Sequence, residues 1–105
     1  MIIKSPISQD EWESYYRLRF TILRAPWNQP LGSEVLADES DAIHAMVMEN
    51  DQIIGVARMH KSGENQGQVR CVAVAAEAQG KGVGKAIMLH LEEKAMSMGI
   101  QEIIL

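Results

Sequence analysis

A glycine-rich segment in the last third of the chain has residue types that can bind phosphate groups. Gly80, Gly82 and Gly84 stand at alternate positions between an apolar run and a helical pattern. Glycine lets the backbone turn sharply and approach a ligand, and the free amides and dipole of a helix start attract anions. Lys81 and Lys85 add positive charge. The segment predicts a site for a diphosphate or a similar anion, or else a plain connection between a strand and a helix.

Two common nucleotide-binding loops do not fit this segment. A P-loop needs Gly-Lys-Ser/Thr five residues after its first glycine, and a Rossmann loop needs a third glycine where Lys85 stands. Both patterns fail on these residues. A nucleotide bound here would therefore be held by a different kind of loop.

The segment from Gln79 to Gly84 resembles the acetyl-CoA signature of the GCN5-related N-acetyltransferases, Gln/Arg-x-x-Gly-x-Gly/Ala. It matches at Gln79, Gly82 and Gly84, and the expected order of elements is similar to that of the family along the whole chain. The resemblance implies one domain over residues 1–105 that transfers an acetyl group from acetyl-CoA to an amine of a small molecule or protein. Residues 23–34 are similar to a subgroup sometimes fused to a hotdog-fold thioesterase domain.

The resemblance also implies where acetyl-CoA binds. In the family, the strand before the loop offers its backbone edge to the pantetheine arm, and the loop amides take the pyrophosphate. The implied cofactor-binding residues are Val72, Ala73, Val74, Gln79, Gly80, Lys81, Gly82, Val83, Gly84 and Lys85. Family members normally continue beyond the strand at residues 100–105 into a helix and two more strands. That helix commonly carries a tyrosine that protonates the departing CoA thiolate. No general acid or other catalytic residue is therefore assigned.

The elements that position this segment follow from local patterns. We expect strands at residues 1–7, 42–49, 52–60, 68–75 and 100–105, and helices at 8–25 and 83–98. Ser8 and Glu11 form a capping box, Asn50-Asp51 suits a tight hairpin, and a helical turn is expected near residues 34–37 within the loop. The resulting fold class is α/β (α+β), with a mixed, mainly antiparallel central sheet flanked by helices. The resemblance makes it acyl-CoA N-acyltransferase-like and short at its C-terminal end.

The strand over residues 68–75 is expected to have both faces largely covered. Its alternation predicts two opposed sets of side chains, Val69, Cys71 and Ala73 against Arg70, Val72 and Val74. We expect the acetyl-CoA site in a splayed gap between this strand and residues 100–105.

Five further side chains could take part in chemistry or merely in structure. We expect Tyr15 and Tyr16 to pack in the core with their hydroxyl groups at the surface. Arg19 interrupts the apolar face of the same helix and could contact either a carboxylate of the following loop or the acceptor. Arg70 either lines a cleft or lies along the sheet with its guanidinium in solvent. Cys71 is expected to be a small buried thiol and not a nucleophile, because no histidine lies nearby in sequence to activate it.

The carboxylates and histidines suggest no defined catalytic group. Glu34 and Glu77 are conceivable bases, although solvated surface carboxylates have the same pattern. The acidic residues of the long loop could attract a cationic amine or simply be solvated: Glu34, Asp38, Glu39 and Asp41. The histidines are scattered and suit structural or surface roles: His44, His60 and His90.

Composition narrows the class of protein. The chain has 105 residues, of which 47% are apolar, with ten basic and fourteen acidic side chains and a net charge of −4. This predicts one soluble, cytoplasmic domain without a signal peptide, a membrane span or a nucleic-acid partner. With Cys71 as the single cysteine, neither a disulfide nor a metal site is expected. Two alternatives stay open, a non-catalytic acyl-CoA-binding or regulatory module and a piece of a longer protein. A homodimer or a partner chain could complete the apolar sheet edge at residues 103–105.

Overall fold

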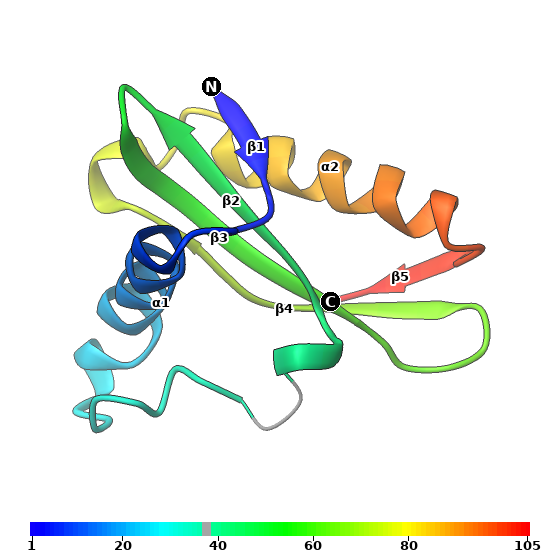
Figure 1. Ribbon diagram of the computed structural model, residues 1–105, viewed down its shortest axis with the longest axis horizontal. Helices are drawn as coiled ribbons and strands as arrows, with labels where there is room; N and C mark the ends of the chain where they lie inside the picture. Colours follow the sequence, from blue (N-terminus) through cyan, green and yellow to red (C-terminus); the bar gives the residue numbers. More distant parts are fainter. Residues whose placement is uncertain (37–38) are drawn as a thin grey trace.

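The computed structural model describes residues 1–36 and 39–105. Its elements, in chain order, are β1 (Ile2–Lys4), α1 (Gln9–Leu23), β2 (Ile43–Glu49), β3 (Gln52–Lys61), β4 (Gln66–Val74), α2 (Val83–Ser97) and β5 (Glu102–Ile104), with single 3-10 turns at Ala25–Trp27, Glu39–Asp41 and Ala76–Ala78. The five strands form one sheet in the order β1-β2-β3-β4-β5, antiparallel except for the parallel pair of β4 and β5 (Figure 1). The predicted fold class, a mainly antiparallel sheet flanked by helices, is confirmed.

Local signals determine where α1 and the hairpin begin and end. The Ser8 hydroxyl accepts a hydrogen bond from the Glu11 amide at 3.1 Å, and the Glu11 carboxylate accepts one from the Ser8 amide at 3.1 Å, so the predicted capping box is present. Asn50 and Asp51 both adopt left-handed backbone angles, with φ of 51° and 62°, as a tight hairpin requires. The edge strand β1 is shorter than the predicted 1–7, because Pro6 cannot donate to the ladder.

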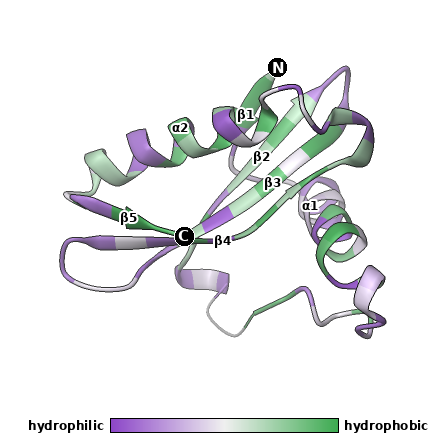
Figure 2. Cartoon of the chain, turned by 180° about the vertical axis from the view of Figure 1, so that it is seen from behind, coloured by the Kyte–Doolittle hydropathy of each residue, from purple (hydrophilic) through white to green (hydrophobic). Residues whose placement is uncertain are grey.

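The two helices cover opposite faces of the sheet. Alternate residues of β2 separate into two cores: Ala45 and Val47 pack towards α2, whereas Met46 packs with Tyr15 of α1. α2 presents a buried stripe at helical spacing, made of Val83, Ile87, Leu91 and Ala95, and Figure 2 shows its hydrophilic and hydrophobic stretches alternating. Gly99, with φ of 77°, follows the helix in the left-handed conformation that its position predicted.

A β-bulge interrupts β4 and changes which side chains share a face. Arg58 of β3 pairs with Arg70 and Val56 pairs with Ala73, so Ala57 alone stands opposite Cys71 and Val72. The extra residue reverses the alternation: Val69 and Val74 both join the α2-side core, whereas Ala73 joins the α1-side core. The predicted sets, in which residues 69, 71 and 73 share one face, are therefore wrong. The prediction that both faces of this strand are covered is also wrong at Arg70 and Val72, which are exposed.

β4 and β5 pair over only three residues each. Gln66–Gln68 of β4 stand beside Glu102–Ile104 of β5, and beyond this point no described residue pairs with the outer edge of β4. The strand β4 begins at Gln66, two residues before the predicted start, and ends at Val74, one residue before the predicted end. β5 ends at Ile104, so the splayed gap expected between the two strands stays a prediction, and the bulge lies in the part of β4 beyond the paired residues.

Candidate functional site

The glycine loop leads into the start of α2 and has open space beside its glycines. Gly80 and Gly82 have left-handed φ angles of 79° and 81°, and Gly82 is the N-cap, whose carbonyl accepts from the Ala86 amide at 3.0 Å. No side chain caps this helix, so the first-turn amides remain available. A Cβ atom added at Gly80, Gly82 or Gly84 would meet nothing within 4 Å. The loop therefore has room for an anion directly over the helix start.

Gly84 has no explanation within the chain itself. It lies in the first turn of α2 without a positive φ, so the backbone does not require glycine there. Glycine within a helix costs roughly 0.5–1 kcal/mol relative to alanine. Gly55 shows the contrasting case, because a Cβ there would come within 2.7 Å of Val83 Cγ1 and 2.9 Å of Ile87 Cδ1. At Gly84 the space that glycine leaves is outside the protein, where a ligand can use it.

The predicted cofactor residues lie on two stretches, the end of β4 and the glycine loop with the first turn of α2, and they differ in what they expose. Gln79 donates from Nε2 to the Val74 carbonyl at 3.2 Å, which ties the loop to the end of β4. The Val83 side chain is 2% exposed and packs in the core, so only its backbone can contact a ligand. Lys85 is exposed on α2. Lys81 instead lines a separate hollow of about 310 Å³ whose lining includes the carboxylate residue Glu77.

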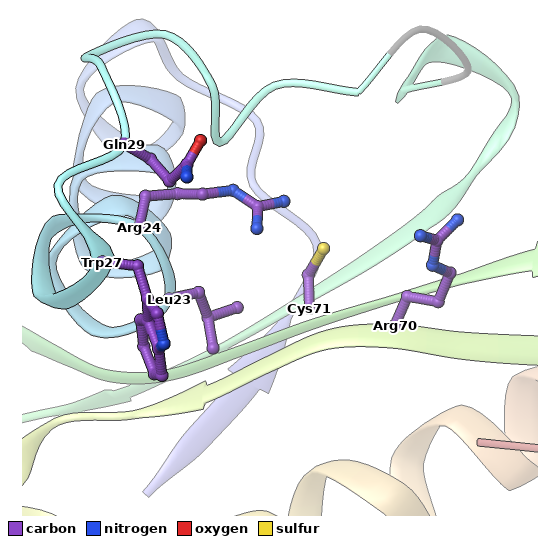
Figure 3. Close-up of a pocket in the computed structure, with 6 residues that line it drawn as sticks. All are labelled: Leu23, Arg24, Trp27, Gln29, Arg70 and Cys71. Atoms are coloured by element: carbon purple, nitrogen blue, oxygen red, sulfur yellow. The ribbon is translucent and has the colours of Figure 1, made fainter.

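A second concavity lies on the α1 side of the sheet, beside the bulge. It measures about 450 Å³ and is lined by residues from the end of α1, the turn that follows and β4, namely Leu23, Arg24, Trp27, Gln29, Arg70 and Cys71 (Figure 3). We call it the Arg24–Arg70 pocket. Cys71 has a φ of 58° and is only half-buried, which corrects the expectation of a buried thiol. Arg70 lines the pocket and is also exposed, so it both lines a cleft and has its side chain in contact with solvent, as the two interpretations of this residue proposed.

Three of these lining residues carried only a general signal in the sequence. Arg24, Trp27 and Gln29 come at the end of α1 and in the loop after it, within residues 23–34, whose similarity to the thioesterase-fused subgroup gave them no role. Loops as long as residues 25–41 are often functional in compact domains. Residues 31–34 form a turn and Glu39–Asp41 a 3-10 turn, whereas the helical turn expected near 34–37 reaches into residues 37–38, which lie outside the described part of the chain.

A buried polar network connects α1 to the long loop. The Tyr15 hydroxyl donates to the Ala57 carbonyl at 3.0 Å, lies 2.8 Å from His44 Nδ1 and accepts from Arg19 at 2.9 Å. Tyr15 is 0% exposed, so the prediction that its hydroxyl group lies at the surface is wrong. Burial raises the pKa of Tyr15 and lowers the pKa of His44, which keeps both side chains neutral near pH 7. This arrangement gives His44 the structural role that was expected.

Arg19 and Arg58 hold the acidic loop in place. Arg19 donates to the Glu34 carbonyl at 2.9 Å and pairs with the Glu39 carboxylate, and Arg58 donates to the same carboxylate at 2.9 Å. Arg19 therefore contacts a loop carboxylate, one of its two predicted partners. The Glu34 carboxylate accepts from the Gly32 amide at 2.7 Å. Glu34 and Glu39 are thus engaged within the protein, and Asp38 lies outside the described residues.

The remaining candidates form no further site. Glu77 is exposed in the turn before the glycine loop, and burial lowers the pKa of His90 on α2. Among residues 1–36 and 39–105, no group of three or more histidine, cysteine or acidic side chains is placed to hold a metal ion. Within the same ranges, no helix is long and apolar enough to cross a membrane.

Solved structures of acyltransferases share this architecture. The fold superposes on glucosamine-6-phosphate N-acetyltransferase from Arabidopsis thaliana with a TM-score of 0.71 and 20% identity, covering 99% of this chain and 80% of that one. It superposes on an acyl-CoA N-acyltransferase from Pseudomonas aeruginosa with 0.79 and 20%, covering 95% and 72%. An aminoglycoside 6'-N-acetyltransferase complexed with coenzyme A gives 0.75 and 16%, covering 94% and 57%.

The sheet order, the two covering helices and the glycine loop define an acyl-CoA N-acyltransferase-like fold. Sequence comparison agrees over almost the whole chain. The chain belongs to the acetyltransferase (GNAT) family, whose family model matches residues 7–105. The resemblance that the glycine loop suggested is therefore confirmed at the level of the family, whereas the similarity to the thioesterase-fused subgroup stays a prediction.

Proposed function

We propose that this chain binds acetyl-CoA along the outer edge of β4 and over the glycine loop, and transfers the acetyl group to an amine in the Arg24–Arg70 pocket. One observation carries the proposal. The start of α2 has open space over three glycines, and no side chain caps its first-turn amides. Free amides at a helix start suit a pyrophosphate, and the edge of a strand such as β4 suits an extended, amide-containing chain.

The chain's own residues divide the work between the two sides of the sheet. The amides from Gly80 to Gly84 and the Lys85 ammonium would hold phosphates, and the backbone of Val72 to Val74 would hold the pantetheine arm. The bulge at Cys71 leaves one residue of β4 outside the regular ladder, and it lines the pocket on the α1 side. A ligand on the β4 edge and a ligand in the pocket would thus meet at the bulge.

Acetyl-CoA supplies a thioester, an activated acyl group. In the overall reaction the amine nitrogen forms a bond to the acetyl carbon, the carbon–sulfur bond breaks, and the amine proton passes through solvent to the thiolate. The protein contributes mainly proximity and orientation, because no carboxylate or histidine is among the described residues that line the pocket.

A calorimetric titration with acetyl-CoA tests the binding step, with CoA and ATP as controls. We expect saturable binding of both CoA forms and much weaker binding of ATP, which lacks the pantetheine arm. No binding of acetyl-CoA by the folded chain would contradict the proposal.

The second candidate function is acyl-CoA binding without catalysis. The absence of an acid or base among the described lining residues favours it, because transfer then depends on an amine that is already neutral. Product assays with amine acceptors separate the two functions. Acetylated product that disappears in a loop variant unable to bind acetyl-CoA excludes the binding-only function.

A further inference from the structure

We propose that the Arg24–Arg70 pocket selects acceptors that carry an anionic group beside the amine, and that the fitting class is an α-amino acid with an apolar side chain. This inference rests on the proposed function for its acetyl donor. It concerns only the acceptor, for which neither the fold nor the family defines a chemistry.

The two arginines approach the pocket from different elements. Arg24 extends from the end of α1, and its Nε donates to the Ser33 carbonyl at 3.1 Å, which holds the side chain in place. Arg70 rises from β4 just before the bulge. In Figure 3 both guanidinium groups lie on the same side of β4, with the Cys71 sulfur between them. Guanidinium groups offer several donors in a plane and are suited to carboxylate oxygens.

The described lining of the pocket is positively charged. Of the described residues that line it, none is acidic, although the chain as a whole has a net charge of −4. Two loop carboxylates have partners elsewhere, Glu34 in the Gly32 amide and Glu39 in two buried arginines, and the exposed Asp41 is not among the lining residues. The lining of the pocket thus favours an anionic acceptor over the cationic amine that the acidic loop suggested.

The rest of the lining suits an apolar side chain of limited size. Leu23 and the indole of Trp27, which is 67% exposed, form an apolar flank. The volume of about 450 Å³ lies in the range of small-molecule sites. A carboxylate on the arginines would leave the amine of the same molecule close to two positive charges, which lower its pKa and favour the neutral form. The pocket can thus supply a reactive amine without a general base.

Binding of product-like molecules tests the acceptor class without needing turnover. We would titrate N-acetyl-L-phenylalanine and its uncharged analogue N-acetyl-L-phenylalaninamide into the chain by calorimetry. We expect the carboxylate to bind about tenfold or more tightly, which corresponds to a charge-assisted contact. Arg70→Gln should abolish this difference. Arg17→Gln, which removes an exposed arginine of α1 that does not line the pocket, should preserve it.

The outcomes separate this inference from the proposed function. Equal binding of the two analogues, or no binding of either, by a chain that binds acetyl-CoA would overturn the anion preference and leave the proposed function intact. If the wild-type chain does not bind acetyl-CoA but prefers the carboxylate in a way that depends on Arg70, the proposed function is overturned and the anion preference stands.

Turnover gives a second, independent reading. With acetyl-CoA, we expect L-phenylalanine to be acetylated about tenfold faster than L-phenylalaninamide at subsaturating concentration, and spermidine to be poorer still. The amide has the less basic amine and hence more of the reactive neutral form, so intrinsic reactivity opposes the expected order. Faster acetylation of the amide or of spermidine by the wild-type chain would overturn the inference.

Discussion

Gly84 offers a test in which stability and ligand binding should change in opposite directions. A side chain at this position meets no protein atom within 4 Å, so Gly84→Glu introduces no clash. Replacing glycine in a helix gains up to about 1 kcal/mol, and a carboxylate in the first turn adds about 0.3–1 kcal/mol through the helix dipole. We expect the free energy of unfolding to rise by about 0.5–1.5 kcal/mol, and Tm by several degrees for a domain of this size.

The same carboxylate should oppose a bound diphosphate. Two like charges about 6 Å apart repel by roughly 0.7 kcal/mol in water and roughly 3 kcal/mol near a protein surface. The affinity for acetyl-CoA should therefore fall by about 3-fold to 100-fold for each facing phosphate charge. Calorimetry measures the affinity, and urea unfolding followed by the fluorescence of Trp12 and Trp27 measures stability.

Gly84→Ala is the matched control. It removes the same glycine but adds only a methyl group and no charge, and the family signature accepts alanine at this position. We expect a small gain in stability and acetyl-CoA affinity close to that of the wild type. If Gly84→Glu is stable and binds acetyl-CoA within twofold of the wild type, the assignment of the pyrophosphate to the start of α2 is refuted.

Three further predictions concern the scaffold. Tyr15→Phe should lower the unfolding free energy by about 1–3 kcal/mol, because it leaves three buried polar partners of the hydroxyl unsatisfied. Tyr16→Phe removes a single side-chain hydrogen bond to Glu39 and should lower it by less; equal effects in urea unfolding would contradict the network. Gly55→Ala should cost about 1–3 kcal/mol, since its Cβ would lie 2.7 Å from a side chain of α2, and a neutral result would contradict that packing. Burial lowers the folded-state pKa of His44 and His90, so the unfolded chain binds more protons than the folded chain below about pH 6.5. The free energy of unfolding should therefore fall as the pH decreases from about 7 to about 5. This dependence on pH should be weaker in His44→Gln, and it would be absent if both histidines titrated normally.

Features that depend on neighbours in sequence were predictable. The capping box of Ser8 and Glu11, the left-handed turn at Asn50-Asp51 and the glycine loop all rest on contacts within a few residues. The same holds for the buried stripe of α2, which follows from helical periodicity. The family itself was recognisable from Gln79, Gly82 and Gly84, because this short segment carries the geometry of the helix start.

The bulge in β4 could not be predicted from its own residues. The run from Val69 to Val74 alternates as a regular strand would, and only the pairing with β3 places Ala57 opposite two residues. That register depends on how the packed faces of β3 and β4 fit the two helices, which is a long-range property. The reversal of faces at Cys71 and the shape of the pocket beside it follow from the bulge.

By itself, the sequence determined the order and type of the elements, the glycine loop at the start of α2, and the family, because these depend on local backbone preferences and short spacings. Only the tertiary structure decided which distant charges meet. Arg24 and Arg70 are far apart in the chain yet line one pocket, whereas the Glu39 carboxylate of the acidic loop pairs with Arg19 and Arg58. Charge pairing between distant elements depends on burial and register, and these arise only when the helices pack on the sheet.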